Sequence, residues 1–233
     1  MTKEMDMAVW DQFLTEDDKK VCAKRKPRDK NGPGDKVALV IIDMQVTACG
    51  YDKPIWEQLD VYSGACGPHA WKSIPIQNQM IAAARAVGMP IIWTKHIFHP
   101  HMGFPQSAPD NNFSSLSHKS DLPEGMTIEE GDILVEKQTA SGFAYTNLPI
   151  ILKHHGIDGI LLMGNSTSGC VRATAVDGRA AGYKVTVIEE CVFDRIEASH
   201  ALALFDMQFK YCDVISAADA LEVIGGAAAE KAA

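Results

Sequence analysis

Six short apolar segments, separated by amphipathic stretches of helical length, constrain the fold of this chain more than any other feature. Each segment has the length of a β-strand, and several are rich in β-branched residues. Because the segments are almost continuously apolar, they are typical of strands that are covered on both faces. The six segments are residues 37–43, 89–96, 133–137, 159–165, 184–190 and 211–217.

Amphipathic segments of helical length lie between most of these strands and before the last one. Three of the four clearest end in glycine, which commonly follows the last turn of a helix. They cover residues 76–88, 145–156, 171–182 and 197–209. Alternating strands and helices favour a parallel sheet. The sequence therefore predicts an α/β protein with a six-stranded, mostly parallel sheet between two layers of helices.

The length of 233 residues and the hydrophobic content of 46% suit one packed domain with terminal extensions. We expect an N-terminal arm over residues 1–36, the α/β domain over 37–224 and a flexible C-terminal tail over 225–233. The arm is highly charged, and we expect it to aid solubility, with contact to a neighbouring subunit as the alternative. The long polar segment 97–126 is either an active-site cover or a disordered insertion.

The charge distribution argues against several classes of partner. The net charge is −8, and no block of lysines or arginines offers a basic surface for phosphate groups. We therefore expect no nucleic-acid partner. The apolar runs are too short to span a membrane, and the charged first residues do not form a signal peptide. We therefore expect a cytoplasmic protein that has no membrane partner and binds a small-molecule substrate.

The cysteines and histidines do not form a typical metal-binding motif. The six cysteines lack a short paired spacing, which argues against a zinc ribbon or a disulfide framework. His96, His99 and His101 form a cluster, but Pro100 interrupts regular ligand geometry, so a polar loop is the simpler interpretation. We expect no metal and no cofactor.

Cys170 is the strongest single indication of function. It follows the apolar strand 159–165 and a run of small residues, and it opens an alanine-rich helix. The amides of a first helical turn have no partner within the helix and carry the positive end of the helix dipole, so they favour a thiolate and can bind an oxyanion. A packing role, which is the more common fate of a free cysteine, is the alternative.

Two further reactive groups are expected beside this thiol. Asp43 ends the first strand and Lys137 ends the third, and the carboxyl ends of parallel strands lie at the same edge of a sheet. Asp43 can then take the proton of Cys170 and pass it to a leaving amine, while Lys137 favours both negative charges. The thiolate would attack a carbonyl, with the backbone amides of Ser166 and Cys170 as the oxyanion hole.

These motifs resemble those of the isochorismatase-like cysteine hydrolases. VIIDMQ at Asp43, VEKQTASGFAYTNL at Lys137 and GNSTSGCVRATAVD at Cys170 match that family in order and spacing, over about residues 37–221. The resemblance implies a Rossmann-like three-layer α/β/α sandwich, an Asp-Lys-Cys triad and a cis peptide bond between Asn165 and Ser166. It also implies a homo-oligomer, either a dimer or a tetramer.

Within the family, TSGCVRATAVD followed by Asp194 and Arg195 is most similar to the N-carbamoylsarcosine amidase branch. That resemblance implies that Arg195 and the turn at Thr167 bind a substrate carboxylate, for which a guanidinium is well shaped. The alternative for Arg195 is a surface ion pair with Asp194. His96 is a further candidate pocket residue, and Arg172 is expected on the surface or at an interface.

Other branches of the family fit less well. Metal-dependent nicotinamidases carry an aspartate and histidines after the first motif, whereas this chain has only Asp52 there. Their aspartate two residues before the cysteine is Ser168 here. The leading hypothesis is a cysteine-dependent amidohydrolase that releases ammonia from an N-carbamoylsarcosine-like substrate through a thioester. Alternatives are a maleamate, ureidoacrylate or nicotinamide amidase, and a non-catalytic family member that only binds.

Overall fold

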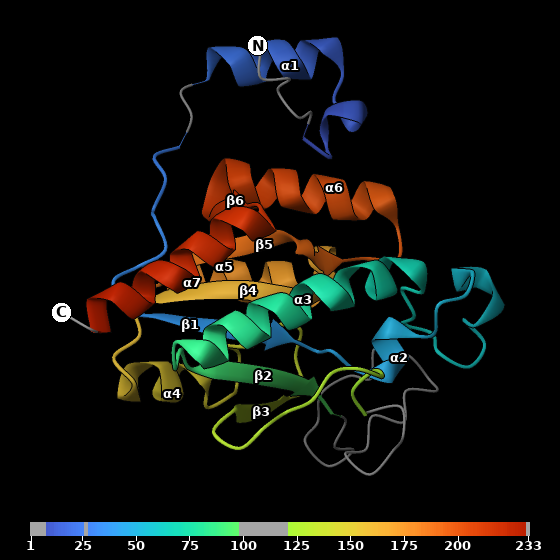
Figure 1. Cartoon of the computed structure of the whole chain (residues 1–233). Helices are drawn as coiled ribbons and strands as arrows, with labels where there is room; N and C mark the ends of the chain where they lie inside the picture. Colours follow the sequence, from blue (N-terminus) through green and yellow to red (C-terminus); the bar gives the residue numbers. More distant parts are fainter. Residues whose placement is uncertain (1–7, 26–27, 98–120, 232–233) are drawn as a thin grey trace, which may run out of the picture.

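A six-stranded sheet forms the centre of the molecule (Figure 1). In the computed structural model, which describes residues 8–25, 28–97 and 121–231, the strand order is β3-β2-β1-β4-β5-β6 and every pairing is parallel. The strands are β1 (Val37–Ile42), β2 (Ile91–His96), β3 (Ile133–Lys137), β4 (Gly159–Asn165), β5 (Lys184–Phe193) and β6 (Asp213–Ile215). The predicted α/β fold is confirmed. The sheet was expected to be mostly parallel, and all of its strand pairs are parallel.

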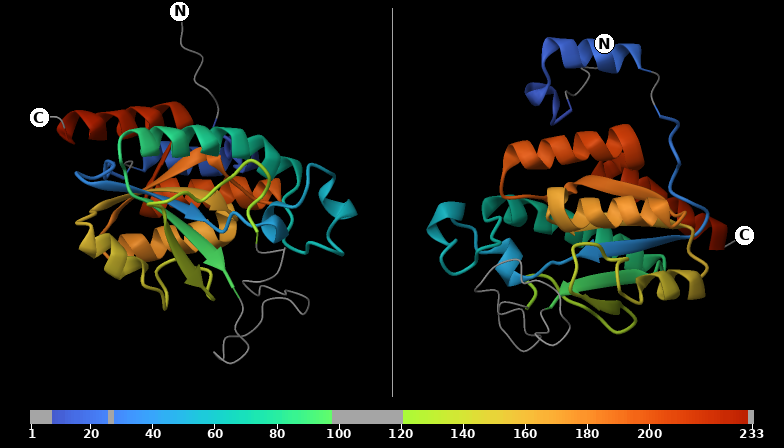
Figure 2. Two further views of the ribbon diagram at one scale, coloured as in Figure 1. Left: turned by 60° about the horizontal axis from the view of Figure 1, so that its bottom comes forward. Right: turned by 180° about the vertical axis from the view of Figure 1, so that it is seen from behind.

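Helices cover both faces of this sheet, which gives the three-layer sandwich. Helices α3 and α7 lie on one face, and α4, α5 and α6 lie on the other, as the view from behind in Figure 2 makes clear. The α-helices are α1 (Glu16–Lys24), α2 (Val46–Cys49), α3 (Pro68–Ala86), α4 (Leu148–His154), α5 (Arg172–Ala180), α6 (Glu197–Asp206) and α7 (Ala217–Lys231). Shorter helical turns are η1 (Asp11–Phe13), η2 (Ile55–Glu57), η5 (Thr167–Val171) and η6 (Met207–Tyr211).

The hydrophobic core has two halves because successive strand residues point to opposite faces. Along β1, Leu39 and Ile41 join the half beneath α3 and α7, whereas Val40 and Ile42 join the half beneath α4, α5 and α6. All four side chains are fully buried. Burial of both faces explains why the strands read as continuous apolar runs.

The strand order reverses between β1 and β4, so the crevice at their carboxyl ends is the expected place for a ligand. Gly164, near the end of β4, allows the two strands to approach closely there. Its φ of +111° suits glycine, and a Cβ atom at this position would lie 2.2 Å from the carbonyl oxygen of Ile42. The residue after each strand, Asp43 and Ser166, is thereby brought to one edge of the sheet.

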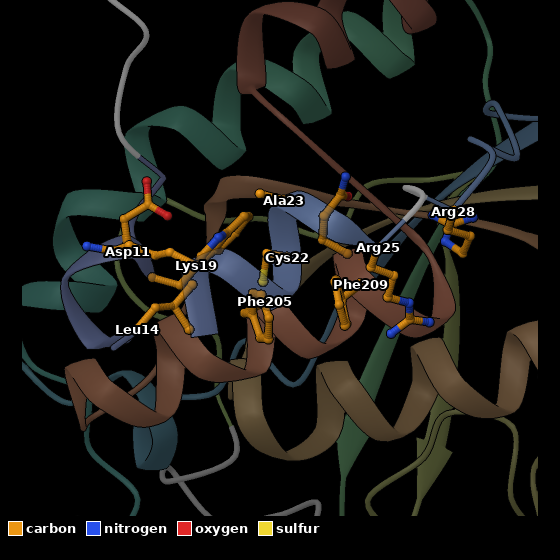
Figure 3. Close-up of a pocket in the computed structure, with 11 residues that line it drawn as sticks. Asp11, Leu14, Lys19, Cys22, Ala23, Arg25, Arg28, Phe205 and Phe209 are labelled. Atoms are coloured by element: carbon orange, nitrogen blue, oxygen red, sulfur yellow. The ribbon is translucent and has the colours of Figure 1, made fainter. Parts of the chain in front are cut away.

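The N-terminal arm packs against α6 and η6 of its own chain. Its helix α1 begins with a capping box between Thr15 and Asp18. Trp10 packs against Phe205 with 6.2 Å between ring centroids, and the guanidinium of Arg25 lies 4.2 Å from the ring centroid of Phe209. A cavity of about 480 Å³ remains between the arm and this surface (Figure 3).

Asp213, at the start of β6, anchors the linker between the arm and the sheet. Its carboxylate accepts hydrogen bonds from the backbone amides of Asn31 and Gly32, each at 3.0 Å, and forms an ion pair with Arg28. Only 3% of Asp213 is exposed. A single buried carboxylate therefore holds three positions of the linker.

We expect Asp213→Ala to release the linker and to lower the free energy of unfolding by about 1–3 kcal/mol, because it leaves buried donors without an acceptor. Urea denaturation measures the loss, and limited trypsin digestion should cut the lysine-rich arm faster. Asp35→Ala is the matched control, since the Asp35 side chain is 97% exposed on the same linker. Equal stability and equal cleavage of the two variants would contradict the anchoring role.

The structure describes most of the expected C-terminal tail but little of the long polar segment 97–126. Residues 225–231, part of the segment expected to be a flexible tail, form the last turns of α7. Residues 98–120, which include His99, His101 and most of the expected cover, lie outside the described residues. None of the helices in the described ranges has the length and apolar character needed to cross a membrane.

Candidate active site

Asp43 directly follows β1 and is held by Thr94 of the neighbouring strand β2. The backbone N–H of Asp43 donates to the carbonyl oxygen of Thr94 at 3.2 Å and to Thr94 Oγ1 at 3.1 Å. Thr94 Oγ1 in turn donates to Asp43 Oδ1 at 2.7 Å. Asp43 has a φ of 48°, a left-handed conformation that aspartate tolerates better than most residues but that still costs about 1–3 kcal/mol. The surrounding hydrogen bonds thus fix the direction of this carboxylate.

Lys137, the last residue of β3, is a buried cation that lies against one carboxylate and two backbone carbonyl oxygens. Its Nζ lies 2.6 Å from Asp43 Oδ2, 2.9 Å from the carbonyl oxygen of Thr139 and 3.1 Å from that of Ala140. Burial by itself would lower the pKa of Lys137, but the adjacent Asp43 and Cys170 raise it above its usual value. Lys137 therefore stays protonated and faces the site as a positive charge.

Cys170 lies in the π-helical turn η5, on the other side of Asp43. Burial and, after it, the charge of Asp43 raise the pKa of its thiol, Lys137 lowers it, and the net result is a pKa of about 12. Burial therefore favours the thiol over the thiolate that its place at a helix start suggested, because a charged sulfur is costly in a desolvated site. The sulfur lies within 4.8 Å of a carboxylate oxygen of Asp43, and the charges of Asp43 and Lys137 both act on the thiol. Ionisation of Cys170 is thus coupled to a base that is already in place.

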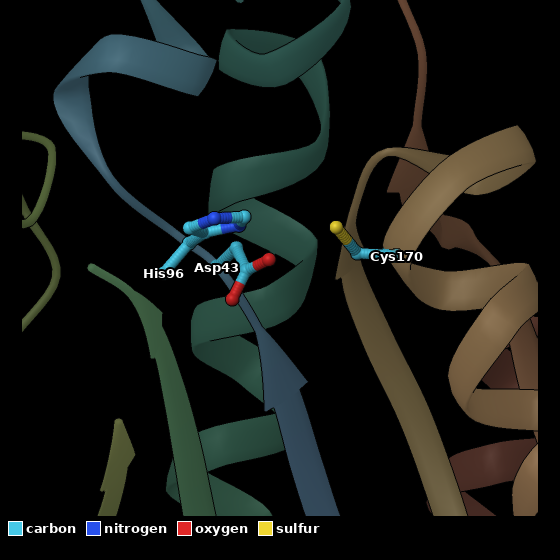
Figure 4. Close-up of side chains that lie close together, drawn as sticks. All are labelled: Asp43, His96 and Cys170. Carbon is cyan, nitrogen blue, oxygen red and sulfur yellow. The ribbon is translucent and has the colours of Figure 1, made fainter. Parts of the chain in front are cut away.

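His96 completes the cluster from the end of β2 (Figure 4). One ligand-type atom each of His96, Asp43 and Cys170 lies within 4.8 Å of the other two. The backbone N–H of His96 donates to Gln45 Oε1 at 2.8 Å, and Gln45 Nε2 donates to the carbonyl oxygen of His96 at 3.0 Å. Burial lowers the pKa of His96, and the charge of Lys137 lowers it further. A neutral imidazole therefore borders the thiol.

These three groups include the donor types that zinc accepts, but their hydrogen bonds fit a metal poorly. Asp43 Oδ1 already accepts a hydrogen bond from Thr94, and Asp43 Oδ2 pairs with the buried ammonium of Lys137. A divalent cation at this carboxylate would lie beside an existing positive charge in a low-dielectric site. The arrangement favours proton transfer between Cys170 and Asp43 over metal coordination.

The turn between β4 and Cys170 is joined directly to the first strand. The bond between Asn165 and Ser166 is a cis peptide, as the family resemblance implied. Asn165 is buried, and its Nδ2 donates to the backbone carbonyl oxygen of Asp43 at 2.6 Å. The residue before the turn and the residue that carries the carboxylate are therefore fixed to each other.

Three backbone amides of this turn donate hydrogen bonds to acceptors of the protein itself. The amide of Ser168 donates to Asp194 Oδ2 at 2.9 Å. The amides of Gly169 and Val171 donate to the carbonyl oxygen of Ser166 at 3.0 and 3.2 Å. An oxyanion would therefore have to be bound by the other amides of the turn. Those are the amides of Ser166, Thr167 and Cys170, which include the two expected at the sequence level.

Thr167, expected near the substrate carboxylate, faces the protein interior. It is fully buried, and its Oγ1 lies 2.8 Å from Nδ1 of His200 on α6. Its side chain is thus part of the support of the turn.

Arg195 and Asp194 follow β5 and do not form the surface ion pair considered as an alternative. Asp194 is 2% exposed, and its carboxylate points to Ser168. Arg195 reaches across to the loop before α3, where its Nη2 donates to the carbonyl oxygen of Gly64 at 2.7 Å. Its Nε is buried and has no hydrogen-bond partner among the described residues. One donor of the guanidinium is therefore left without a protein acceptor.

Arg172 is the first residue of α5 and contacts α6. Its Nη2 lies 3.3 Å from Asp206 Oδ2, and both side chains are partly exposed. This contact fits the surface role expected for Arg172, because the partly exposed pair connects α5 and α6.

Two supporting residues, Thr94 and His200, had not been identified from the sequence, and Asn165 had been named only for the cis peptide bond. Thr94 and Asn165 lay inside segments interpreted as strands. Their polar side chains in otherwise apolar runs were the only sequence feature that could have indicated a role in the site. His200 lay inside a helical pattern that gave no indication of its partner. Asp194 was considered only for a contact with Arg195.

The two partly buried histidines predict a loss of stability at mildly acidic pH. Burial lowers the pKa of both His96 and His200 from the usual 6.5, so the unfolded chain binds more protons than the folded chain just below that pH. The free energy of unfolding should therefore fall as the pH drops from 7.5 to 5.5.

Urea denaturation at the two pH values measures this effect, and His200→Gln should make the pH dependence shallower. His154→Gln, on the exposed end of α4, is the control and should leave the pH dependence unchanged. If His200→Gln and the wild type lose the same stability between pH 7.5 and 5.5, His200 does not contribute.

Comparison with known sequences gives a consistent set of relatives. A family model described as the isochorismatase domain matches residues 37–219. Maleamate amidohydrolase of Pseudomonas putida is 41% identical over 99 residues, which are 42% of this chain and 46% of that protein. N-carbamoylsarcosine amidase of an Arthrobacter species is 29% identical over 152 residues, 61% of this chain and 58% of the relative. The chain thus spans about half the length of these curated relatives.

Solved structures share the fold over most of the chain. A cysteine hydrolase from Pseudomonas syringae pv. phaseolicola matches with a TM-score of 0.74 at 19% identity, covering 88% of this chain and 99% of the other. N-carbamoylsarcosine amidase from Thermoplasma acidophilum matches with a TM-score of 0.61 at 26% identity, covering 78% and 96%. The Pseudomonas syringae structure, at 19% identity, supports only the three-layer fold.

Proposed function

The chain belongs to the isochorismatase-like cysteine hydrolase family, and we propose that it is an amidohydrolase that cleaves a terminal C–N bond by cysteine catalysis. The observation that carries this proposal is the buried cluster of Asp43, Lys137 and Cys170 at the carboxyl ends of β1 and β3 and in the turn after β4. A charged lysine, a fixed carboxylate and a thiol in contact are the groups that nucleophilic attack on an amide requires.

The reaction starts with attack of the Cys170 sulfur on the carbonyl carbon of the substrate, and Asp43 takes the thiol proton as this bond forms. Amides of the turn at 166–170 bind the oxyanion. Asp43 returns the proton to the leaving nitrogen, which departs as ammonia and leaves a thioester. Water, deprotonated by Asp43, cleaves the thioester and restores the thiol of Cys170. Lys137 remains charged throughout and stabilises each negative charge that forms beside it.

The substrate class follows from the cation that remains available. Arg195 uses Nη2 for Gly64 but keeps an unpaired, buried Nε. A guanidinium with free donors favours a carboxylate, so we infer a small substrate that carries a carboxylate and a terminal amide or carbamoyl group. Maleamate and N-carbamoylsarcosine, named in two of the relatives, and ureidoacrylate, named in others, have these features.

The test is ammonia release from maleamate, N-carbamoylsarcosine, ureidoacrylate and nicotinamide by the wild type and by Cys170→Ala. We expect release from one carboxylate-bearing compound, lost in Cys170→Ala and kept in the control Cys22→Ala, whose thiol lies on the arm. Arg195→Gln should then raise KM for that compound by about tenfold or more. Release of ammonia that does not depend on Cys170 would overturn the proposal.

A further inference from the structure

The turn that carries Cys170 is held from one side by the segment that follows β5. Two consecutive side chains of the turn, Thr167 and Ser168, each contact a residue of this segment. Their partners are His200 on α6 and Asp194 just after β5. Helix α6 packs against the turn as a whole, so the support is part of the fold rather than one isolated contact.

Asp194 is a buried carboxylate whose hydrogen bonds come from neutral donors. Oδ2 accepts from the backbone amide of Ser168 at 2.9 Å and from Ser168 Oγ at 2.6 Å. Oδ1 accepts from the backbone amide of Arg195 at 2.8 Å. Burying a charge is costly unless hydrogen bonds compensate, and three donors converge here on one group. Such a carboxylate acts as a fixed acceptor.

The bond to the Ser168 amide has a consequence for the neighbouring amides. Because a peptide unit is planar, fixing the Ser168 N–H also fixes the carbonyl of Thr167 and limits rotation of the peptide unit before it. The amides of Gly169 and Val171 are held by the carbonyl oxygen of Ser166. The orientation of the amides that remain for an oxyanion therefore depends on the acceptor at Asp194.

His200 holds the same turn at the preceding residue. Its Nδ1 lies 2.8 Å from Oγ1 of the fully buried Thr167. The charged or titratable groups that act on this imidazole are Asp194, His69 and Glu197. The turn is thus held at two successive side chains by groups outside the Asp-Lys-Cys cluster.

We propose that Asp194 is a positioning residue that orients the backbone amides before Cys170 for oxyanion binding, with His200 as its second support. The inference rests on the proposed function, since an oxyanion forms only in attack on a carbonyl. It assigns Asp194 no contact with the substrate and no proton transfer. Its effect should therefore appear in carbonyl chemistry and not in the general reactivity of the thiol.

The experiment compares two reactions of Cys170 in the same protein. Acylation by p-nitrophenyl acetate passes through an oxyanion, whereas alkylation by iodoacetamide displaces iodide at a saturated carbon and forms none. We expect Asp194→Asn to slow acylation by about 10²-fold, the size of effect that follows loss of an oxyanion contact. Alkylation should change by less than about threefold. Asparagine has the shape of aspartate but only one acceptor oxygen, so it cannot accept from both Ser168 and the Arg195 amide, and its NH₂ repels the donors that it faces.

Two further variants sharpen the result. Ser168→Ala removes the hydroxyl donor and keeps the amide bond to Asp194, so its loss of acylation should be smaller than that of Asp194→Asn. Asp206→Asn, which alters a partly exposed carboxylate on α6, is the matched control and should change neither reaction. Circular dichroism melting establishes that each variant is folded.

The outcomes separate this inference from the proposed function. Equal loss of acylation and alkylation in Asp194→Asn would show a general structural role and overturn the inference, as would no loss of acylation. Neither reagent depends on the natural substrate, so the inference is decided even if the wild type releases no ammonia from any compound tested. That last result would count against the proposed function alone.

Discussion

Replacing Lys137 by methionine should lower the free energy of unfolding by about 3–5 kcal/mol, because it leaves a buried carboxylate without its counter-ion. The Lys137 side chain is 0% exposed and that of Asp43 is 6% exposed, with 2.6 Å between Nζ and Oδ2. Methionine keeps much of the length of the side chain and removes the charge.

Urea denaturation of a double variant tests this explanation. Adding Asp43→Asn to Lys137→Met removes the unpaired charge, so the double variant should be more stable than Lys137→Met alone. Lys184→Met, which alters a partly exposed lysine at the start of β5, is the control and should cost less than about 1 kcal/mol. Additive losses from the two buried substitutions would contradict a charge-pair explanation.

The close pairing of Asp43 and Lys137 could be predicted in part from the sequence. Both residues end apolar strands, and parallel strands place their carboxyl ends at one edge, so their proximity followed from the fold. The pairing also required the strand order, since β2 lies between β1 and β3 and Lys137 must reach past it. Neither strand order nor the conformation of Asp43 is encoded in hydrophobic periodicity.

The supports of the site depend on long-range contacts that local patterns do not reveal. Asp194 and Ser168 are 26 residues apart, and Asp213 lies 181 residues from Gly32. Each aspartate is compatible with an exposed position when its sequence neighbours alone are considered. Their burial follows from the docking of a loop or linker onto the end of a strand, which is decided by tertiary packing.

The raised pKa of Cys170 changes the chemical role expected of the triad. A thiol with a pKa of about 12 is not ionised before the substrate binds, so its proton must leave as the bond to carbon forms. Asp43 is the adjacent base, and Lys137 stabilises the charge that moves to either group. Burial therefore makes the three residues act as one unit, in which loss of a single member removes most of the activity.

Cys170→Ser should consequently lower kcat/KM by at least about 10³-fold, although serine has nearly the same size and keeps a transferable proton. An alcohol is far less acidic than a thiol, and the carboxylate of Asp43 is too weak a base to deprotonate it. Ammonia release from the best substrate gives the rate, and Cys22→Ser, on the arm, is the control that should match the wild type. A serine variant within tenfold of the wild type would contradict the requirement for sulfur, because either the serine oxygen or a water molecule activated by Asp43 would then be a sufficient nucleophile.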